Sequence, residues 1–269
     1  MNTNNKQIFD YFCVLDFEAT CQESNKDYTM EIIEFPSVMI NTNTLQIEGT
    51  FQMYVKPIVN PILSNYCTNL TGITQEQVDD ADDFSEVLKQ FTTWISTYGS
   101  NILFITCGDW DLKTMLPNQC GISNLSKLGL FIEMPEMFSS WCNIKKMYNR
   151  YYSEKVRGIR AMKEINSGTY FNVGKENHQQ NHYYRVQGMK SLLNRLGLPL
   201  IGRKHSGIDD SRNIAAATVK MCQDGCVFEY TQPKRDIGDE LIEGLRAILR
   251  GEGKRTEIKL EETGTDDAN

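Results

Sequence analysis

The sequence predicts an α/β fold built around a mixed β-sheet. Short runs of apolar, β-branched and aromatic residues suit strands, and longer segments repeat apolar residues with helical spacing. The first three predicted strands are joined by short connections, which indicates an antiparallel or mixed edge to the sheet. With 269 residues, the chain is long enough for one large α/β domain with insertions, or for a domain and a tail.

Five segments have the character of strands. Residues 11–15 are almost entirely apolar, residues 31–40 are mostly apolar, and residues 45–55 alternate between apolar and polar. Residues 101–107 form a short apolar run, as expected for a central strand covered on both faces. Residues 141–144 favour one more short strand.

Helices are expected between and after these strands. Thr74 opens a capping-box motif, so a short helix should begin there. Residues 84–98 have an amphipathic pattern, and a further helix is expected at 113–119. Residues 187–198 form a helix stopped by glycine and proline, and the last helix opens within 203–211 and runs to Met221.

Composition and charge limit the class of protein. Hydrophobic residues make up 40% and charged residues 23%, as in ordinary globular proteins. The net charge of −7 gives no global attraction for nucleic acid, so a polyanion must be met by local basic patches and metal ions. The eight cysteines lack disulfide-framework spacing, which fits reduced thiols in an intracellular, cytoplasmic or nuclear protein. We expect no signal peptide and no membrane span.

The end of the first strand carries two carboxylates. Asp16 and Glu18 are two residues apart, so on a strand their side chains leave the same face. Two carboxylates in a poorly solvated place repel, and one should take up a proton unless the pair shares a cation. Taken alone, such a pair is more often an exposed strand end with two unrelated acids. Matching acids elsewhere in the chain would make it informative.

Such acids follow later in the sequence. Asp111 lies just beyond the predicted strand at 101–107, at the edge where open α/β sheets bind ligands. Alternatively, Asp109 and Asp111 only cap the next helix. His205 precedes Asp210 by five residues in a glycine-containing loop, so the two could face one cavity. By itself that spacing is a weak pattern.

Together these residues resemble the DEDDh 3′–5′ exonuclease superfamily, which includes ribonuclease T and proofreading exonucleases. One branch is closer: VLDFEATC, LTGITQEQVD, GDWDL and GMKSLLNRLGLPLIGRKHSGIDDSRNIA look like the Eri/histone-mRNA 3′-exonuclease family. The resemblance covers residues 11–227 and implies a ribonuclease-H-like mixed sheet, its first three strands antiparallel, flanked by helices. It implies an exonuclease domain of residues 1–232, with an insertion around 150–184 that is longer than the family's usual connection.

The resemblance also implies two divalent cations, Mg²⁺ with Mn²⁺ able to substitute. Asp16 would bridge both ions, Glu18 and Asp210 would complete one, and Asp111 would help to hold the other, largely through water. Two ions roughly 3.5–4 Å apart stabilise the attacking and leaving oxygens of a phosphodiester displacement. His205, on a movable loop, would take the proton from the attacking water.

Specificity for a 3′ end needs a closed pocket for the terminal nucleotide. Trp110 is the candidate to stack on the last base, with Leu70 and Thr71 on the other side, as the family suggests. The alternative for Trp110 is simple core packing. The expected substrate-contacting residues are Phe17, Ala19, Leu70, Thr71, Trp110, Lys190 and Arg203, with Lys190, Arg195, Arg203 and Lys204 able to follow the nucleic-acid backbone.

Three segments allow alternatives. Residues 145–163 mix basic residues with tyrosines, which fits a groove for single-stranded nucleic acid or equally a solvated helix face. Residues 233–269 are expected to form a charged helix and a disordered tail. Residues 166–184 are expected to form a polar loop, and a zinc site is conceivable from His178, His182, Cys222 and Cys226, although nothing joins the two pairs.

The sequence therefore predicts a metal-dependent 3′–5′ exoribonuclease that releases nucleoside 5′-monophosphates from RNA 3′ ends, single-stranded or with a short overhang, in RNA processing, turnover or small-RNA regulation. One rival is a nuclease with the same site that prefers DNA: the 2′-hydroxyl distinguishes the two substrates, and no residue here settles the preference. A second is a catalytically idle nucleic-acid-binding adaptor. Retention of all four acids and His205 argues against the adaptor, because unpaired buried carboxylates are costly without a metal or catalytic role.

Overall fold

The computed structural model describes residues 6–23, 28–126, 134–153 and 186–232. All of them fall within one compact unit, Met1–Lys234. The predicted charged helix and tail at 233–269, most of the insertion around 150–184, and the candidate zinc ligands His178 and His182 lie outside the described residues.

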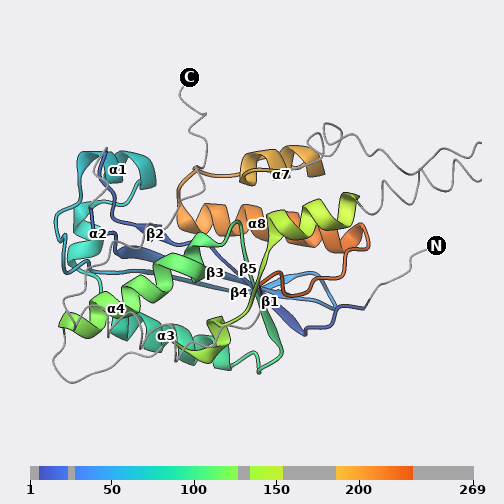
Figure 1. The fold of residues 1–269 in the computed structure, drawn as a ribbon, viewed down its shortest axis with the longest axis horizontal. Coiled ribbons are helices and arrows are strands. Elements are labelled where there is room, and N and C mark those ends of the chain that lie inside the picture. The colour runs from blue at the N-terminus through green and yellow to red at the C-terminus, as the bar shows by residue number, and fades with distance from the viewer. Residues whose placement is uncertain (1–5, 24–27, 127–133, 154–185, 233–269) are drawn as a thin grey trace, which may run out of the picture. The chain divides into compact units, whose positions relative to one another are not determined.

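A six-stranded mixed sheet forms the centre of the described fold (Figure 1). The strand order is β2-β3-β1-β5-β6, and β4 pairs with β3. β1 pairs antiparallel with β3, and β3 with β4, whereas β1, β5 and β6 are parallel neighbours. The predicted mixed sheet with three antiparallel first strands is confirmed. The strands are β1 (Tyr11–Leu15), β2 (Glu18–Ala19), β3 (Ile32–Asn41), β4 (Ile47–Tyr54), β5 (Ile102–Thr106) and β6 (Trp141–Asn143).

Helices cover both faces of this sheet (Figure 1). α8 contacts β1 and β3 on one face, and α7 packs on α8. α3 contacts β4 and α4 on the other side of the sheet. The helices are α1 (Asn65–Thr71), α2 (Gln75–Asp79), α3 (Phe84–Ser96), α4 (Leu116–Ser126), α7 (Met189–Leu196) and α8 (Gly207–Gln223), with a π-helical turn η1 (Asp111–Met115) and a 3₁₀ turn η2 (Glu136–Phe138).

Alternation along the strands divides the core into two halves. Phe12 and Val14 of β1 belong to the cluster that includes Ile214 of α8. Phe35 of β3 lies in a separate aromatic group, where its ring stacks on Phe91 of α3 at a centroid distance of 4.5 Å. Residues two apart on a strand share a face, so each half of the core has its own helices. The sheet is thereby fixed from both sides.

Several local expectations are confirmed. Thr74 forms the predicted capping box at the start of α2. Gly197 ends α7 in the left-handed conformation, with φ of 70°. The strand at 141–144 is present as β6, and residues 144–153 continue as a helix. All eight cysteines are free thiols.

Among the residues described, no helix is long and apolar enough to cross a membrane.

Other elements were not predicted. No helix was expected where α1 lies, and Glu18, expected with Asp16 at the end of the first strand, belongs to a separate two-residue strand, β2. The helix after β5 begins with the π-helical turn η1. The proposed N-cap role of Asp109 is wrong: its carboxylate accepts from Lys146 Nζ at 2.6 Å and from Trp141 Nε1 at 3.2 Å. Asp109 therefore pairs with Lys146, which is distant in sequence, and does not cap the following helix.

Candidate active site

The four predicted acids meet at one edge of the sheet. Asp16 directly follows β1, and Glu18 lies in β2. Asp111 opens η1 shortly after β5, the parallel neighbour of β1, so the carboxyl ends of both strands share this edge. Asp210 is in the first turn of α8, which packs on β1 and β3. Three segments distant in sequence thus supply the four carboxylates, two of them from the stretch that follows β1.

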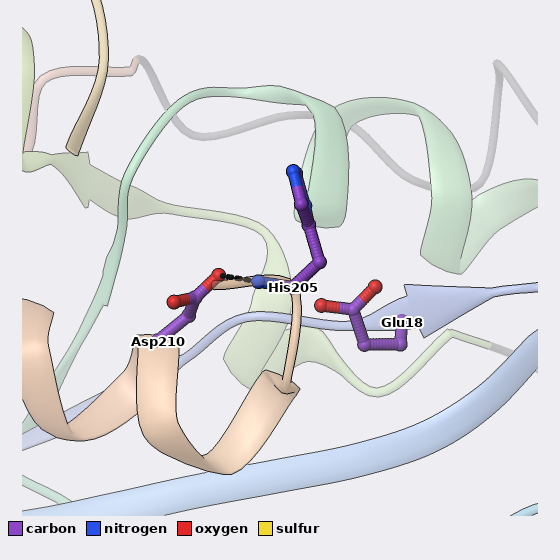
Figure 2. Close-up of side chains that lie close together, drawn as sticks. All are labelled: Glu18, His205 and Asp210. Carbon is purple, nitrogen blue, oxygen red and sulfur yellow. Dashed lines mark hydrogen bonds between the residues drawn. The ribbon is translucent and has the colours of Figure 1, made fainter. Parts of the chain in front are cut away.

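Glu18, His205 and Asp210 form the most compact part of the site (Figure 2). One potential ligand atom from each lies within 4.8 Å of the other two. The backbone N–H of His205 donates to Asp210 Oδ2 at 2.9 Å, so the loop and the helix hold each other in place. Asp210 Oδ1 is buried and has no hydrogen-bond partner. A buried oxygen of this kind is suited to a cation.

Asp111 is held against the stretch that carries the first two acids. Its Oδ1 accepts a hydrogen bond from the backbone N–H of Phe17 at 2.9 Å, across 94 residues of sequence. Phe17 stands between Asp16 and Glu18, so this bond ties the three carboxylates to one another. The π-helical turn η1 places Asp111 at its first position, where the aspartate is buried.

The carboxylates share a poorly solvated and negatively charged place. Burial, reinforced by the Asp210 and Glu34 carboxylates, raises the pKa of Glu18 to about 9. Burial also raises the pKa of Asp111 to about 6 and that of Asp210 to about 6. The pKa of Asp16 is raised well above its ordinary value, first by burial and then by the other acids. Such a cluster holds protons unless a cation neutralises it.

Hard, oxygen-rich ligands and a buried, unpartnered Asp210 Oδ1 fit divalent cations. Within the described part of the chain, Cys222 and Cys226 belong to no group of potential metal ligands. Among the residues described, the structure therefore contains one candidate metal site, formed by Glu18, His205 and Asp210, with the charges of Asp16 and Asp111 nearby.

His205 lies at the margin of this site, partly exposed, with an unusual backbone. Its φ is +61°, in the left-handed region that residues other than glycine rarely adopt. Its ring extends away from α8 in Figure 2. Burial, followed by the charges of Lys204 and Arg203, lowers the pKa of His205. The histidine is thus biased towards the neutral form that can accept a proton.

The loop that carries His205 is anchored at several points. The backbone N–H of Arg203 donates to Asp209 Oδ2 at 2.9 Å. The Arg203 guanidinium donates to the carbonyl oxygens of Asn69 and Leu70 in the last turn of α1. Arg203, expected to contact substrate, therefore connects the His205 loop to α1.

Of the predicted base-stacking residues, only Trp110 is next to one of the acids in sequence. Trp110 immediately precedes Asp111 and is 39% exposed, so the core-packing alternative for Trp110 is wrong. Leu70 is partly buried on α1. Thr71 is buried, and its hydroxyl donates to Cys67 O at 2.9 Å. An exposed indole next to a carboxylate of the site can stack on a base.

The other predicted contacts divide into two groups. The side chains of Phe17 and Ala19 are buried, and the Phe17 ring packs edge-on against Phe35 at 4.7 Å. Lys190, Arg195 and Lys204 are exposed. Any contact with substrate from the first pair must therefore involve mainly the backbone.

Glu34 was missed from the sequence. It lies in β3 as the cross-strand partner of Glu18, and it is only 2% exposed. Its Oε1 accepts from Gln52 Nε2 at 2.8 Å, and its Oε2 accepts from the backbone N–H of Gly207 at 3.0 Å. A glutamate within an apolar strand segment was the available signal, because a buried charge needs partners.

The sequence matches a known family. A family profile described as Exonuclease (RNase_T) covers residues 13–218. The 3′-5′ exoribonuclease 1 of Mus musculus is 41% identical over 239 residues, which is 87% of this chain and 59% of that protein. ERI1 exoribonuclease 3 of Homo sapiens is 38% identical over 230 residues, 84% of this chain and 57% of that protein. The chain thus spans less than two thirds of the length of these relatives.

Solved structures are similar as well. One describes 3′-end specific recognition of histone mRNA stem-loop by 3′-exonuclease; its TM-score is 0.70 with 35% identity, covering 88% of this chain and 71% of that chain. Another is the nuclease domain of 3′hExo, a DEDDh family member, bound to rAMP. Its TM-score is 0.64 with 38% identity, covering 84% of this chain and 98% of that chain.

Proposed function

The chain belongs to the exonuclease family RNase_T, as its motifs predicted, and on this premise we propose that it is a metal-dependent 3′–5′ exoribonuclease. It would remove nucleoside 5′-monophosphates from RNA 3′ ends that are single-stranded or carry a short overhang. The convergence of four acids and one histidine from separate segments carries the proposal. The names of the relatives support RNA rather than DNA as the substrate.

Asp16, Glu18, Asp111 and Asp210 would hold two divalent cations, Mg²⁺ with Mn²⁺ able to substitute. The raised pKa values of these acids and the unpartnered Asp210 Oδ1 support this role. When bound, the two cations stabilise the attacking and leaving oxygens of an in-line phosphodiester displacement.

His205 would act as the general base, accepting the proton of the attacking water on its neutral imidazole. Its lowered pKa keeps the ring unprotonated at neutral pH. The hydrogen bond from its backbone to Asp210 holds the loop that carries the ring beside the acids.

Trp110 would stack on the terminal base, opposite Leu70 of α1, and this clamp would favour an end over an internal nucleotide. Lys190, Arg195 and Lys204 are exposed cations that could follow the upstream phosphates. Arg203 would act mainly by holding the His205 loop to α1. We assign this activity to residues 1–232, within an intracellular protein that is cytoplasmic or nuclear.

Incubation with end-labelled RNA and DNA, in Mg²⁺, in Mn²⁺ or in EDTA, tests this function. A ladder that shortens RNA from its 3′ end, is lost in EDTA and is blocked by a modified 3′-hydroxyl supports the proposal. Faster removal of DNA would indicate the DNA-preferring enzyme, since the 2′-hydroxyl distinguishes the substrates. Binding of RNA without metal-dependent shortening would indicate the idle adaptor.

A further inference from the structure

Glu34 connects the two halves of the candidate metal site. It is the cross-strand partner of Glu18 in the β2–β3 pair. Its Oε2 accepts from the backbone N–H of Gly207, the first residue of α8, and Asp210 lies in the same turn. One buried carboxylate thus joins the strand next to Glu18 to the helix that carries Asp210.

The start of α8 depends on this contact. The N-cap residue Ser206 makes no side-chain hydrogen bond to the helix. The first N–H groups of a helix have no partner within it, so they need an acceptor from elsewhere. Glu34 supplies one from β3, and a negative charge at this end of a helix is favourable.

Gly207 allows the helix to approach this closely. A Cβ at position 207 would lie 2.8 Å from the backbone oxygen of Asp16, 2.9 Å from Glu34 Oε2 and 2.9 Å from Pro36 Cγ. These distances leave no room for a methyl group. The end of α8 is therefore pressed against the residues that carry the first acids.

Each oxygen of Glu34 accepts a hydrogen bond from the protein. Gln52 Nε2 on β4 donates to its Oε1 at 2.8 Å, while Gly207 N donates to its Oε2 at 3.0 Å. Asp210 Oδ1, in contrast, has no hydrogen-bond partner. Glu34 is thereby suited to orient a metal-binding carboxylate, and Asp210 to bind the metal.

We propose that Glu34 is a positioning residue that sets the separation of Glu18 and Asp210 by accepting hydrogen bonds from the start of α8. The inference rests on the proposed function, because it assumes that these acids hold divalent cations. Partners of this kind commonly alter metal affinity about 10–100-fold when they are removed.

The test measures Mn²⁺ binding to the full chain by electron paramagnetic resonance of free Mn²⁺, with RNA shortening assayed in parallel. Glu34→Ala should weaken Mn²⁺ binding by about 10–100-fold, and excess Mn²⁺ should restore most of its RNA shortening. Glu34→Gln keeps an acceptor oxygen and should bind Mn²⁺ within a few-fold of the wild type. Gly207→Ala should weaken binding in the same direction as Glu34→Ala, from the other side of the contact.

Glu31→Ala is the matched control. Glu31 is also a buried carboxylate beside β3, but its oxygens accept from the backbone N–H groups of Ile58, Val59 and Asn60 rather than from α8. This variant should lose stability and keep the Mn²⁺ affinity of the wild type. Equal weakening in Glu31→Ala and Glu34→Ala would attribute the effect to general destabilisation and overturn the inference.

Two further results would overturn it. One is a folded Glu34→Ala chain that binds Mn²⁺ with wild-type affinity. If Glu34→Ala does not fold, wild-type Mn²⁺ affinity in Gly207→Ala has the same meaning. The other is a Glu34→Gln chain as weak as Glu34→Ala, which would mean that the charge acts and not the acceptor. In either case the wild type still binds Mn²⁺ and shortens RNA, so the proposed function stands. A wild-type chain that does neither overturns both.

Discussion

Removing the charge of Asp210 is expected to stabilise the metal-free protein. Its pKa is about 6 in the folded chain, against an ordinary value of 3.8. Between these two pKa values the folded chain therefore binds more protons than the unfolded chain, and raising the pH through this range lowers the free energy of unfolding. Each tenfold change in proton affinity corresponds to ~1.4 kcal/mol. At pH 8 the charged Asp210 carboxylate therefore lowers the stability of the folded chain by roughly 3 kcal/mol. Because the neighbouring acids share this cost, we expect Asp210→Asn to gain about 1–3 kcal/mol.

Urea denaturation at pH 8 and pH 5, in EDTA and in saturating Mn²⁺, measures this effect. The advantage of Asp210→Asn should fall to about half at pH 5 and reverse in Mn²⁺, where binding stabilises the wild type. Asp80→Asn, at an exposed position at the end of α2, should change stability by less than about 0.5 kcal/mol. An Asp210→Asn chain no more stable than the wild type at pH 8 in EDTA would refute the view that these acids repel.

Four other predictions concern single residues. His205→Asn should lower kcat roughly 10²–10⁴-fold, measured on end-labelled RNA, and keep Mn²⁺ binding; loss of binding would make the histidine a ligand. In saturating Mn²⁺, kcat/KM should fall as the pH is lowered through the pKa of His205, which burial holds below 6.5, and a midpoint above 6.5 contradicts this. Trp110→Ala should raise KM for RNA about 10-fold or more and Trp110→Phe much less; an unchanged KM excludes stacking. Gly72→Ala should cost about 1–2 kcal/mol in urea denaturation, because φ is +80° and a Cβ would meet Arg203 Nη1 at 2.0 Å; wild-type stability would contradict it.

Sequence patterns located the central elements of the fold because their burial is nearly complete. β1 is apolar throughout, β5 is apolar up to its last residue, Thr106, and α3 buries a regular stripe of side chains. α1 was missed since only two of its seven residues, Cys67 and Thr71, are buried, so it has no helical periodicity to detect. β2 has two residues and depends on β3 for its pairing. Elements formed by tertiary contact leave little trace in a short window.

The site residues that form local sequence motifs could be predicted, whereas contacts between residues distant in sequence could not. Asp16 and Glu18 form a pair in the sequence. The hydrogen bond from the backbone N–H of Phe17 to Asp111 spans 94 residues, and no sequence pattern predicts it. Asp109 was assigned to the following helix, although Lys146 holds its carboxylate. Glu34 was read as one residue of a strand because its partners, Gln52 and Gly207, come from other elements.

The backbone conformation of His205 affects which substitutions would be selected if this protein were evolved for thermal stability. A φ of +61° is cheap for glycine or asparagine and costs a histidine on the order of 1 kcal/mol. The repelling carboxylates beside it carry a similar penalty. A library sorted for heat resistance alone should therefore accumulate replacements at position 205 and among the acids. The selected variants would be thermostable but inactive, so a screen for stability must also measure catalytic activity in every round.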